Sequence, residues 1–324
     1  MPITTSNNNE PEITIEINER KFIDALKGLP DYRDNRGKWH SLTFFIVTVV
    51  FAMLVGRSKV FSIHRYMTHK IVWLREVTGI KDAPLVSRAH FPRMLENLDW
   101  QDLNRLINAF FDEKTVHIIA NEWVAIDGKV MRGTIKSGEK QAIIHAVSHQ
   151  SRFDVAQARQ VGDKASEIPV TRELLKETRL SSKKISLDAH HCNPETMTQV
   201  NQDGGFFIIQ VKKNQPKLLE KCRVLSKQTP LAEFTQHDAG HGRITSRHAV
   251  LQPLSVAEID ERWKASGLQT LVVMNRETFE KATQKKTTET SYYLSNCKNN
   301  NAKNTVKTLA TAIRQHWSVE SNNW

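Results

Sequence analysis

The stretch NEWVAIDGKVMRG, residues 121–133, is the first part of the chain with the character of a β-strand. Two further runs of this kind follow it, QAIIHAVSHQ and FDVAQARQVG, and turn or charged segments separate the three. Short runs of apolar and β-branched residues between turn signals predict successive strands in a meander.

Helices and strands are expected to alternate after this meander. A helix is expected at EIPVTRELLKET, where Pro169 lies in the first turn, and then a strand at KKISLDA, a helix at PETMTQVNQD and a strand at GGFFIIQVKKN. The order βββαβαβ is that of an RNase H-like sheet, in which the first strand lies beside the fourth. The sequence therefore predicts an α/β fold of this kind over residues 121–324.

Residues 216–300 are too many for a loop, and RITSRHAVLQPL, LQTLVVMNRE and ETSYYLSNC within them have strand character. We expect a β-rich insertion here, before a last helix. Upstream, residues 1–15 are predicted to be a disordered tail, and residues 16–120 an all-α N-terminal domain. Its longest apolar run, residues 42–56, is short for a membrane span of about 20 residues, which favours a buried core helix.

The chain of 324 residues carries 46 basic against 35 acidic side chains, a formal charge of +11. Such an excess favours a polyanion partner, whether DNA, RNA or an acidic membrane surface. Its three cysteines are too few for a disulfide framework or a four-ligand zinc site, and the first fifteen residues do not read as a signal peptide. A reducing cytoplasm is expected. No phosphate-binding loop motif is present, so no nucleotide is expected.

Three carboxylates stand at places where a charge needs a partner. Asp127 interrupts the apolar strand WVAID, and Asp188 ends the strand KISLD, where an aspartate can also simply open a turn. Glu320 falls on the apolar stripe of the last helix with Val306, Leu309, Ile313 and Trp317. A pair of divalent cations would satisfy all three. The rival interpretation, a zinc site in DAHHC at residues 188–192, is disfavoured because consecutive residues rarely converge on one ion.

Several segments together resemble the H-repeat-associated transposases, which are linked to Rhs elements within the DDE transposase superfamily. These segments are VAIDGKVMRGT, VGDKASEIP, ISLDAHHCN, FFIIQVKKNQP, HGRITSR, IRQHWSVES and the upstream DYRDNRGKWHSL. The resemblance implies an RNase H-like catalytic domain in which Asp127, Asp188 and Glu320 hold two Mg²⁺ ions, for which Mn²⁺ can substitute. It also implies double-stranded DNA, both element ends and target, as partner, a homodimer on DNA, and a bacterial, nucleoid-associated location.

The resemblance further marks the following residues as candidates for contacts to DNA: Lys129, Arg132, Lys164, Lys212, Asn214, Gln215, Arg243, Arg247 and His316. Related insertion-sequence transposases commonly carry an arginine four residues before the glutamate and a tyrosine three residues earlier, where this chain has His316 and Ile313. The basic and amide residues also fit solvated strand ends and turns.

The function expected is therefore a DNA transposase that cleaves and joins strands by two-metal chemistry. The alternatives are a catalytically inactive DNA-binding remnant and, behind it, a nuclease of the same fold. Because Glu320 lies only four residues before the last residue, we expect it to be loosely held and the chain to be a truncated copy of low activity.

Overall fold

The computed structural model describes residues 19–99, 102–104, 106–107, 110, 122–130, 141–152, 154–161, 167–240 and 242–317. The chain divides into two compact units, Met1–Lys114 and Thr115–Trp324. The expected tail at residues 1–15 lies outside the described residues.

Helices make up the regular structure that is described in the first unit. They are α1 (Glu19–Lys27), the 3₁₀ helix η1 (Asn35–Trp39), α2 (Leu42–Leu54), α3 (Val60–Thr78) and α4 (Phe91–Glu96). Ser41 caps α2 by accepting a hydrogen bond from the backbone N–H of Phe44, and Gly79 ends α3 in the left-handed conformation. None of the helices described in the chain is both long and apolar enough to cross a membrane.

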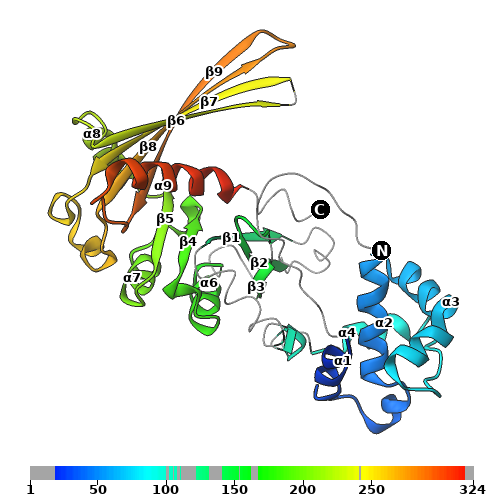
Figure 1. Ribbon diagram of the computed structural model, residues 1–324. Helices are drawn as coiled ribbons and strands as arrows, with labels where there is room; N and C mark the ends of the chain where they lie inside the picture. The colour runs from blue at the N-terminus through cyan, green and yellow to red at the C-terminus, as the bar shows by residue number, and fades with distance from the viewer. Residues whose placement is uncertain are drawn as a thin grey trace. The chain divides into compact units, whose positions relative to one another are not determined.

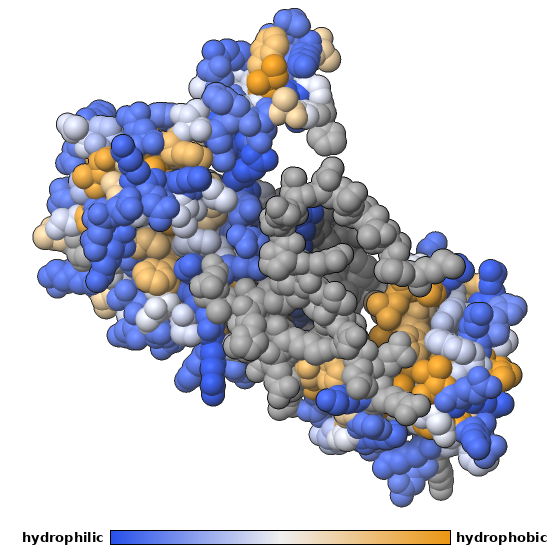
Figure 2. Space-filling model, viewed as in Figure 1, coloured by the Kyte–Doolittle hydropathy of each residue, from blue (hydrophilic) through white to orange (hydrophobic). Residues whose placement is uncertain are grey.

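The first unit buries its own core, in which Leu26, Phe45, Met67, Leu74 and Phe91 are fully inaccessible or nearly so. Other hydrophobic residues reach its surface among hydrophilic ones (Figure 2). Several of them gather where α2 ends and α3 begins: Met53, Leu54, Val55, Val60 and Phe61.

A nine-stranded sheet in the order β3-β2-β1-β4-β5-β9-β8-β7-β6 organises the second unit (Figure 1). Its strands are β1 (Trp123–Val130), β2 (Gln141–Ser148), β3 (Asp154–Val161), β4 (Lys184–Leu187), β5 (Phe206–Val211), β6 (Ala232–Gly240), β7 (Arg243–Pro253), β8 (Thr270–Glu280) and β9 (Lys285–Ser295). The central strands β1, β4 and β5 are parallel, and the other pairs are antiparallel. The mixed α/β class expected from the sequence is confirmed.

Helices cover both faces of the sheet, and each face has a hydrophobic core. The helices are α6 (Glu167–Glu177), α7 (Pro194–Gln202), α8 (Pro216–Leu225), α9 (Ala302–His316) and the 3₁₀ helices η3 (Leu180–Ser182), η4 (Ala189–His191), η5 (Val256–Glu258) and η6 (Glu261–Ser266). The core with α6, α7 and α8 contains Val124, Ile126 and Leu187. The core with α9 contains Trp123, Ile208 and Ile313. Because both faces are covered, consecutive residues of β1 are buried.

The region expected to be an insertion extends this same sheet, because β9 pairs with β5. Two hairpins, β6–β7 and β8–β9, project beyond the helices (Figure 1). The three strands expected here correspond to β7, β8 and β9, while β6 and the helix α8 were not foreseen. Strand β6 alternates half-buried and exposed residues and is mostly polar, which weakens its pattern. Pro216 at the first turn and the buried Leu218, Leu219, Cys222 and Leu225 were the available signals for α8.

Candidate functional site

Asp127 and Asp188 each follow the last paired residue of two neighbouring parallel strands, at the point where these strands separate. The register of β1 and β4 pairs Ile126 with Leu187, and each aspartate is the next residue in its strand's direction. Strand β4 ends at Leu187, whereas β1 continues to Val130 along β2. From Asp127 onward, β1 therefore has no pairing with β4 on that edge. Crevices at the carboxyl ends of parallel strands are common places for ligands in α/β proteins.

A hydrogen-bonded turn holds Asp188 in place. Its Oδ1 accepts hydrogen bonds from the backbone N–H groups of His190 at 2.9 Å and His191 at 3.4 Å, so it caps η4. Asn214 donates its side-chain N–H to the carbonyl of Ala189 at 2.6 Å. Gln215 does the same for the carbonyl of Cys192 at 2.8 Å. Asp188 thus does open a turn, and the hydrogen bonds of this turn orient its half-buried carboxylate.

Two carboxylate–histidine pairs, neither foreseen from the sequence, lie next to the two aspartates. His145 is the cross-strand neighbour of Asp127 on β2, and its Nδ1 lies 2.7 Å from Oδ2 of Asp154. Glu167, in the first turn of α6, lies 3.2 Å from Nε2 of the fully buried His191. The signal for Glu167 was its place on the buried face of α6, one turn before Thr171 and two before Leu174.

At position 128, directly after Asp127, any side chain would require Glu167 to move. A β-carbon there would lie 2.6 Å from the carboxyl carbon of Glu167. Glu167 is itself nearly buried and bonded to His191. The carboxylate of Glu167 therefore packs directly against the backbone that carries Asp127, and the bond to His191 links it to the turn that carries Asp188.

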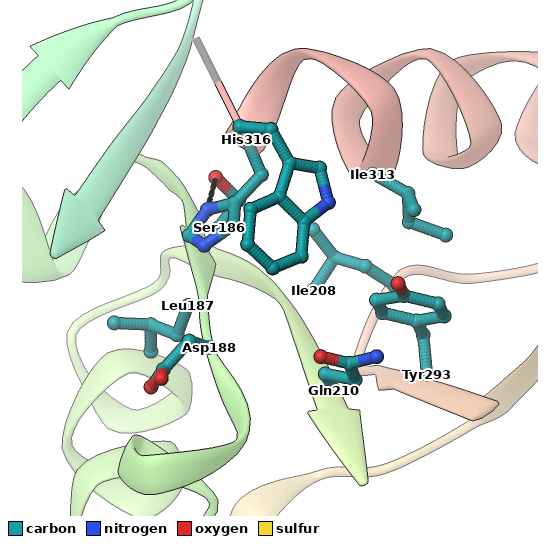
Figure 3. Close-up of a pocket in the computed structure, with 9 residues that line it drawn as sticks. Ser186, Leu187, Asp188, Ile208, Gln210, Tyr293, Ile313 and His316 are labelled. Carbon is teal, nitrogen blue, oxygen red and sulfur yellow. Dashed lines mark hydrogen bonds between the residues drawn. The ribbon is translucent and has the colours of Figure 1, made fainter. Parts of the chain in front are cut away.

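A small cavity of about 10 Å³, roughly the room for one water molecule, lies between the end of α9 and the sheet (Figure 3). The residues that line it are Ser186, Leu187, Asp188, Ile208, Gln210, Tyr293, Ile313, His316 and Trp317. Ser186 and His316 are hydrogen-bonded there, with 2.9 Å between Oγ and Nδ1. On the other side, the same Oγ lies 2.9 Å from Nε2 of His149.

Both of these histidines are kept uncharged near neutral pH by their surroundings. Burial lowers the pKa of His316 from 6.5 to about 4, although the charge of Asp188 acts in the opposite direction. Burial also lowers the pKa of His149 to about 3, and His316 adds to this shift. His316 was expected to contact DNA, but the residue is 8% exposed and its Nδ1 is hydrogen-bonded to Ser186.

The other expected DNA contacts are scattered. Lys212 is exposed just after β5, and Lys129 is half-buried on β1. Arg243 is paired with Glu280 at 3.1 Å near the end of the β6–β7 hairpin, and Arg247 is paired with Asp238 on β6. Asp238 also binds Arg314 of α9, whose hydrogen bond holds the pKa of that aspartate below its usual value. Arg132 and Lys164 lie outside the described residues, as does Glu320.

The stripe that was expected to lead to Glu320 is buried as far as Ile313. Val306 and Leu309 are fully inaccessible and Ile313 is 5% exposed, but Trp317 is 45% exposed and follows the last residue of α9, His316. The inclusion of Trp317 in the buried stripe was therefore wrong. His316, one residue earlier, takes the buried place, because it meets Ser186 of β4.

The DAHHC segment is divided among separate contacts. Asp188 caps η4, His191 bonds Glu167, and burial raises the pKa of the Cys192 thiol to about 12. Among the residues that the structure describes, no group of three or more His, Cys, Asp or Glu side chains is arranged to hold a metal ion. Asp127 and Asp188 supply the oxygen donors that hard cations such as Mg²⁺ prefer, so the described part of the site fits such an ion in donor chemistry.

Two family models together match most of the chain. Residues 121–323 match the model described as "Transposase DDE domain", and residues 23–111 match the model described as "DDE_Tnp_1-associated". Several relatives from Escherichia coli carry the word transposase in their names. YncI of strain O157:H7 is 25% identical over 94% of this chain and 79% of its own length. The H repeat-associated YhhI of strain K12 is 25% identical over 93% of this chain and 80% of its own length.

Among solved structures, the piggyBac transposase synaptic complex with hairpin DNA aligns with 92% of this chain and 64% of its own chain. The sequence identity is 12% and the TM-score is 0.36.

Proposed function

Because the chain belongs to the transposase DDE domain family, with H repeat-associated relatives, we propose that it is a DNA transposase of an insertion-sequence-type element. It cleaves DNA strands at the element ends and joins them to a target. The observation that carries this proposal is the position of Asp127 and Asp188 at the separation of β1 and β4. Two oriented carboxylates at the open ends of parallel strands are a suitable place for phosphodiester chemistry on DNA.

The catalytic domain in this proposal is an RNase H-like domain over residues 121–324. The order β3-β2-β1-β4-β5, with β1, β4 and β5 parallel, supports it. The third carboxylate is Glu320, which follows α9 by a few residues. The helical N-terminal part, residues 16–120, binds DNA, and the protein acts as a homodimer on DNA.

Asp127, Asp188 and Glu320 would hold two Mg²⁺ ions, which supply a nucleophile and stabilise the leaving oxygen; Mn²⁺ can replace them. Side chains and backbone groups of the chain itself orient the carboxylates and bind the DNA. The η4 turn fixes one carboxylate of the site through its bonds to Asp188. Lys212, which is exposed near the turn that accepts a hydrogen bond from Asn214, is the proposed contact to a phosphate of the DNA. Lys129, Arg132, Lys164, Arg243 and Arg247 are the further proposed contacts to the DNA backbone.

The test uses the purified chain, Mg²⁺ and a supercoiled plasmid that carries the DNA flanking its coding sequence, as the source of element ends. We expect nicked or linear product that depends on the divalent ion. Asp127→Asn and Asp188→Asn should each abolish the product while duplex binding persists, because each removes a charged ligand. Asp203→Asn is the matched control, since Asp203 is exposed at the end of α7.

Binding of Mn²⁺, followed by electron paramagnetic resonance, provides a second measurement. It should weaken in both site variants and stay unchanged in Asp203→Asn. Cleavage at the parent rate by Asp127→Asn would overturn that assignment. A parent chain that binds DNA but neither cleaves it nor binds Mn²⁺ would instead support the alternative, a catalytically inactive DNA-binding protein.

A further inference from the structure

Three buried side chains from three distant parts of the second unit form a continuous hydrogen-bonded chain. His149 Nε2 lies 2.9 Å from Ser186 Oγ, and Ser186 Oγ lies 2.9 Å from His316 Nδ1. His149 is 3% exposed, Ser186 1% and His316 8%. The contact between Ser186 and His316 is drawn in Figure 3. We refer to these three residues as the His–Ser–His link.

Each member of the link lies at or near the end of an element. His149 follows the last residue of β2, and its backbone N–H donates to the carbonyl of Trp123 at 2.8 Å, where β1 begins. Ser186 lies on β4, two residues before Asp188. His316 is the last residue of α9. The link therefore joins the end of this helix to the strand that presents one candidate carboxylate.

The link is a buried polar contact between α9 and the sheet, in addition to the partly exposed ion pair of Arg314 with Asp238 of β6. The remaining buried residues of α9, such as Val306, Leu309 and Ile313, contact the sheet through apolar surfaces. Apolar burial is non-directional, so it does not by itself specify which polar groups meet at the end of the helix. A hydrogen bond has a preferred distance and angle, and a buried polar chain selects one arrangement. A hydroxyl both donates and accepts, so Ser186 can serve two uncharged imidazole rings at once.

We propose that Ser186 and His316 are positioning residues, which set the rotation and axial position of the end of α9 relative to Asp188. His149 orients the Ser186 hydroxyl from the other side. In this way the link determines where the chain leaves the helix toward Glu320. The catalytic meaning of this inference rests on the proposed function, but the positioning itself does not.

Ser186→Ala removes the hydroxyl, and Ser186→Thr keeps it. The matched control is Ser295→Ala. Ser295 is also a fully buried strand serine in the same sheet, and its Oγ makes two hydrogen bonds, to the carbonyl of Phe207 at 2.6 Å and from the N–H of Cys297 at 3.0 Å. It does not line the cavity beside Asp188. The measurements are hydrogen exchange of the amides in residues 310–317, melting temperature, duplex binding, and Mg²⁺-dependent cleavage of the flanking-DNA plasmid.

In Ser186→Ala we expect exchange in residues 310–317 to speed up by about 3- to 10-fold, the size expected for one lost hydrogen bond. We expect cleavage to slow by about 10- to 100-fold with little change in duplex affinity, because small misplacements cost rate rather than binding. Ser186→Thr should restore both. Ser295→Ala should lower the melting temperature about as much as Ser186→Ala does. It should change neither the exchange in residues 310–317 nor the cleavage rate.

Unchanged exchange in residues 310–317 of folded Ser186→Ala would overturn the inference. So would a loss of cleavage in Ser295→Ala as large as that in Ser186→Ala, since the effect would then be general destabilisation. If Ser186→Ala does not fold, His316→Leu receives the same measurements, because it removes the ring nitrogen and leaves Ser186 bonded to His149. A parent chain without Mg²⁺-dependent cleavage contradicts the proposed function alone, and the exchange measurement still decides the positioning.

Discussion

The carboxylate of Glu167 lies against Gly128, so closely that a β-carbon at position 128 would be 2.6 Å from the carboxyl carbon. Glu167 cannot move away freely, because it is 7% exposed and bonded to His191. The residue after Asp127 and the turn that begins at Asp188 are therefore connected through one buried side chain.

The first prediction concerns Gly128→Ala. The new methyl group should push the carboxylate of Glu167 away from His191, and we expect the free energy of unfolding to fall by about 1–3 kcal/mol, as for other overpacked sites. Urea denaturation measures it. Gly240→Ala is the control, because a β-carbon at position 240 meets nothing within 4 Å. Equal effects of the two substitutions would contradict the steric argument.

The second prediction is a double-mutant cycle between positions 128 and 167. Glu167→Ala alone should destabilise the protein by about 1–3 kcal/mol, because the fully buried His191 loses its partner. It also makes room for the methyl group of Gly128→Ala. The double variant should therefore cost less than the two single variants together, by roughly 0.5–3 kcal/mol. Urea denaturation of all four proteins gives the coupling, and strict additivity would show that the two sites are independent.

The third prediction concerns pH. The pKa of His149 is lowered by burial from 6.5 to about 3, so below pH 6.5 the unfolded chain binds a proton that the folded chain does not. The stability contribution of the uncharged ring is thus present above about pH 6.5 and is lost progressively as the pH falls toward the folded pKa. We expect the free energy of unfolding to decrease between about pH 6.5 and pH 5. His149→Gln should flatten this decrease in part, because the lowered pKa of the buried His316 acts in the same direction, whereas His237→Gln, at an exposed position on β6, should not flatten it.

The fourth prediction concerns residues 212–215. It distinguishes a side chain that contacts DNA from one that supports the turn beside Asp188. Lys212→Ala should weaken duplex binding and reduce the slope of log K against log salt by about one, because one phosphate contact is lost. Asn214→Ala should leave that slope unchanged and slow cleavage instead, because its amide donates to Ala189 of the turn beside Asp188. Fluorescence anisotropy with a labelled duplex over a salt series distinguishes the two. Lys176→Ala, an exposed position on α6, is the control. A fall in duplex affinity of Asn214→Ala at fixed salt would instead support the expected direct contact of Asn214 with DNA, since a neutral amide adds little to the salt slope.

The apolar run WVAID and the later ISLD predicted the two central strands and the two aspartates from local pattern alone. This was possible because strand character depends on near neighbours, and because a charge inside an apolar run is conspicuous. The same kind of evidence failed at β6, which is mostly polar and, among the described strands, pairs with β7 alone. Local pattern also failed to predict α8, because the whole of residues 216–300 was interpreted as a β-rich insertion.

Local pattern predicted the α/β class of this protein and singled out Asp127 and Asp188 as candidate site residues, and composition alone shows its excess of positive charge. Only the tertiary structure decided which side chains surround the two aspartates: His145 across β2, Glu167 against Gly128, and the His–Ser–His link that moves His316 from an expected DNA contact to the interior. These contacts join residues as far apart as Ser186 and His316. A sequence pattern reports the periodicity of one element, whereas contacts between elements follow from strand register and helix packing, which are set when the whole sheet assembles.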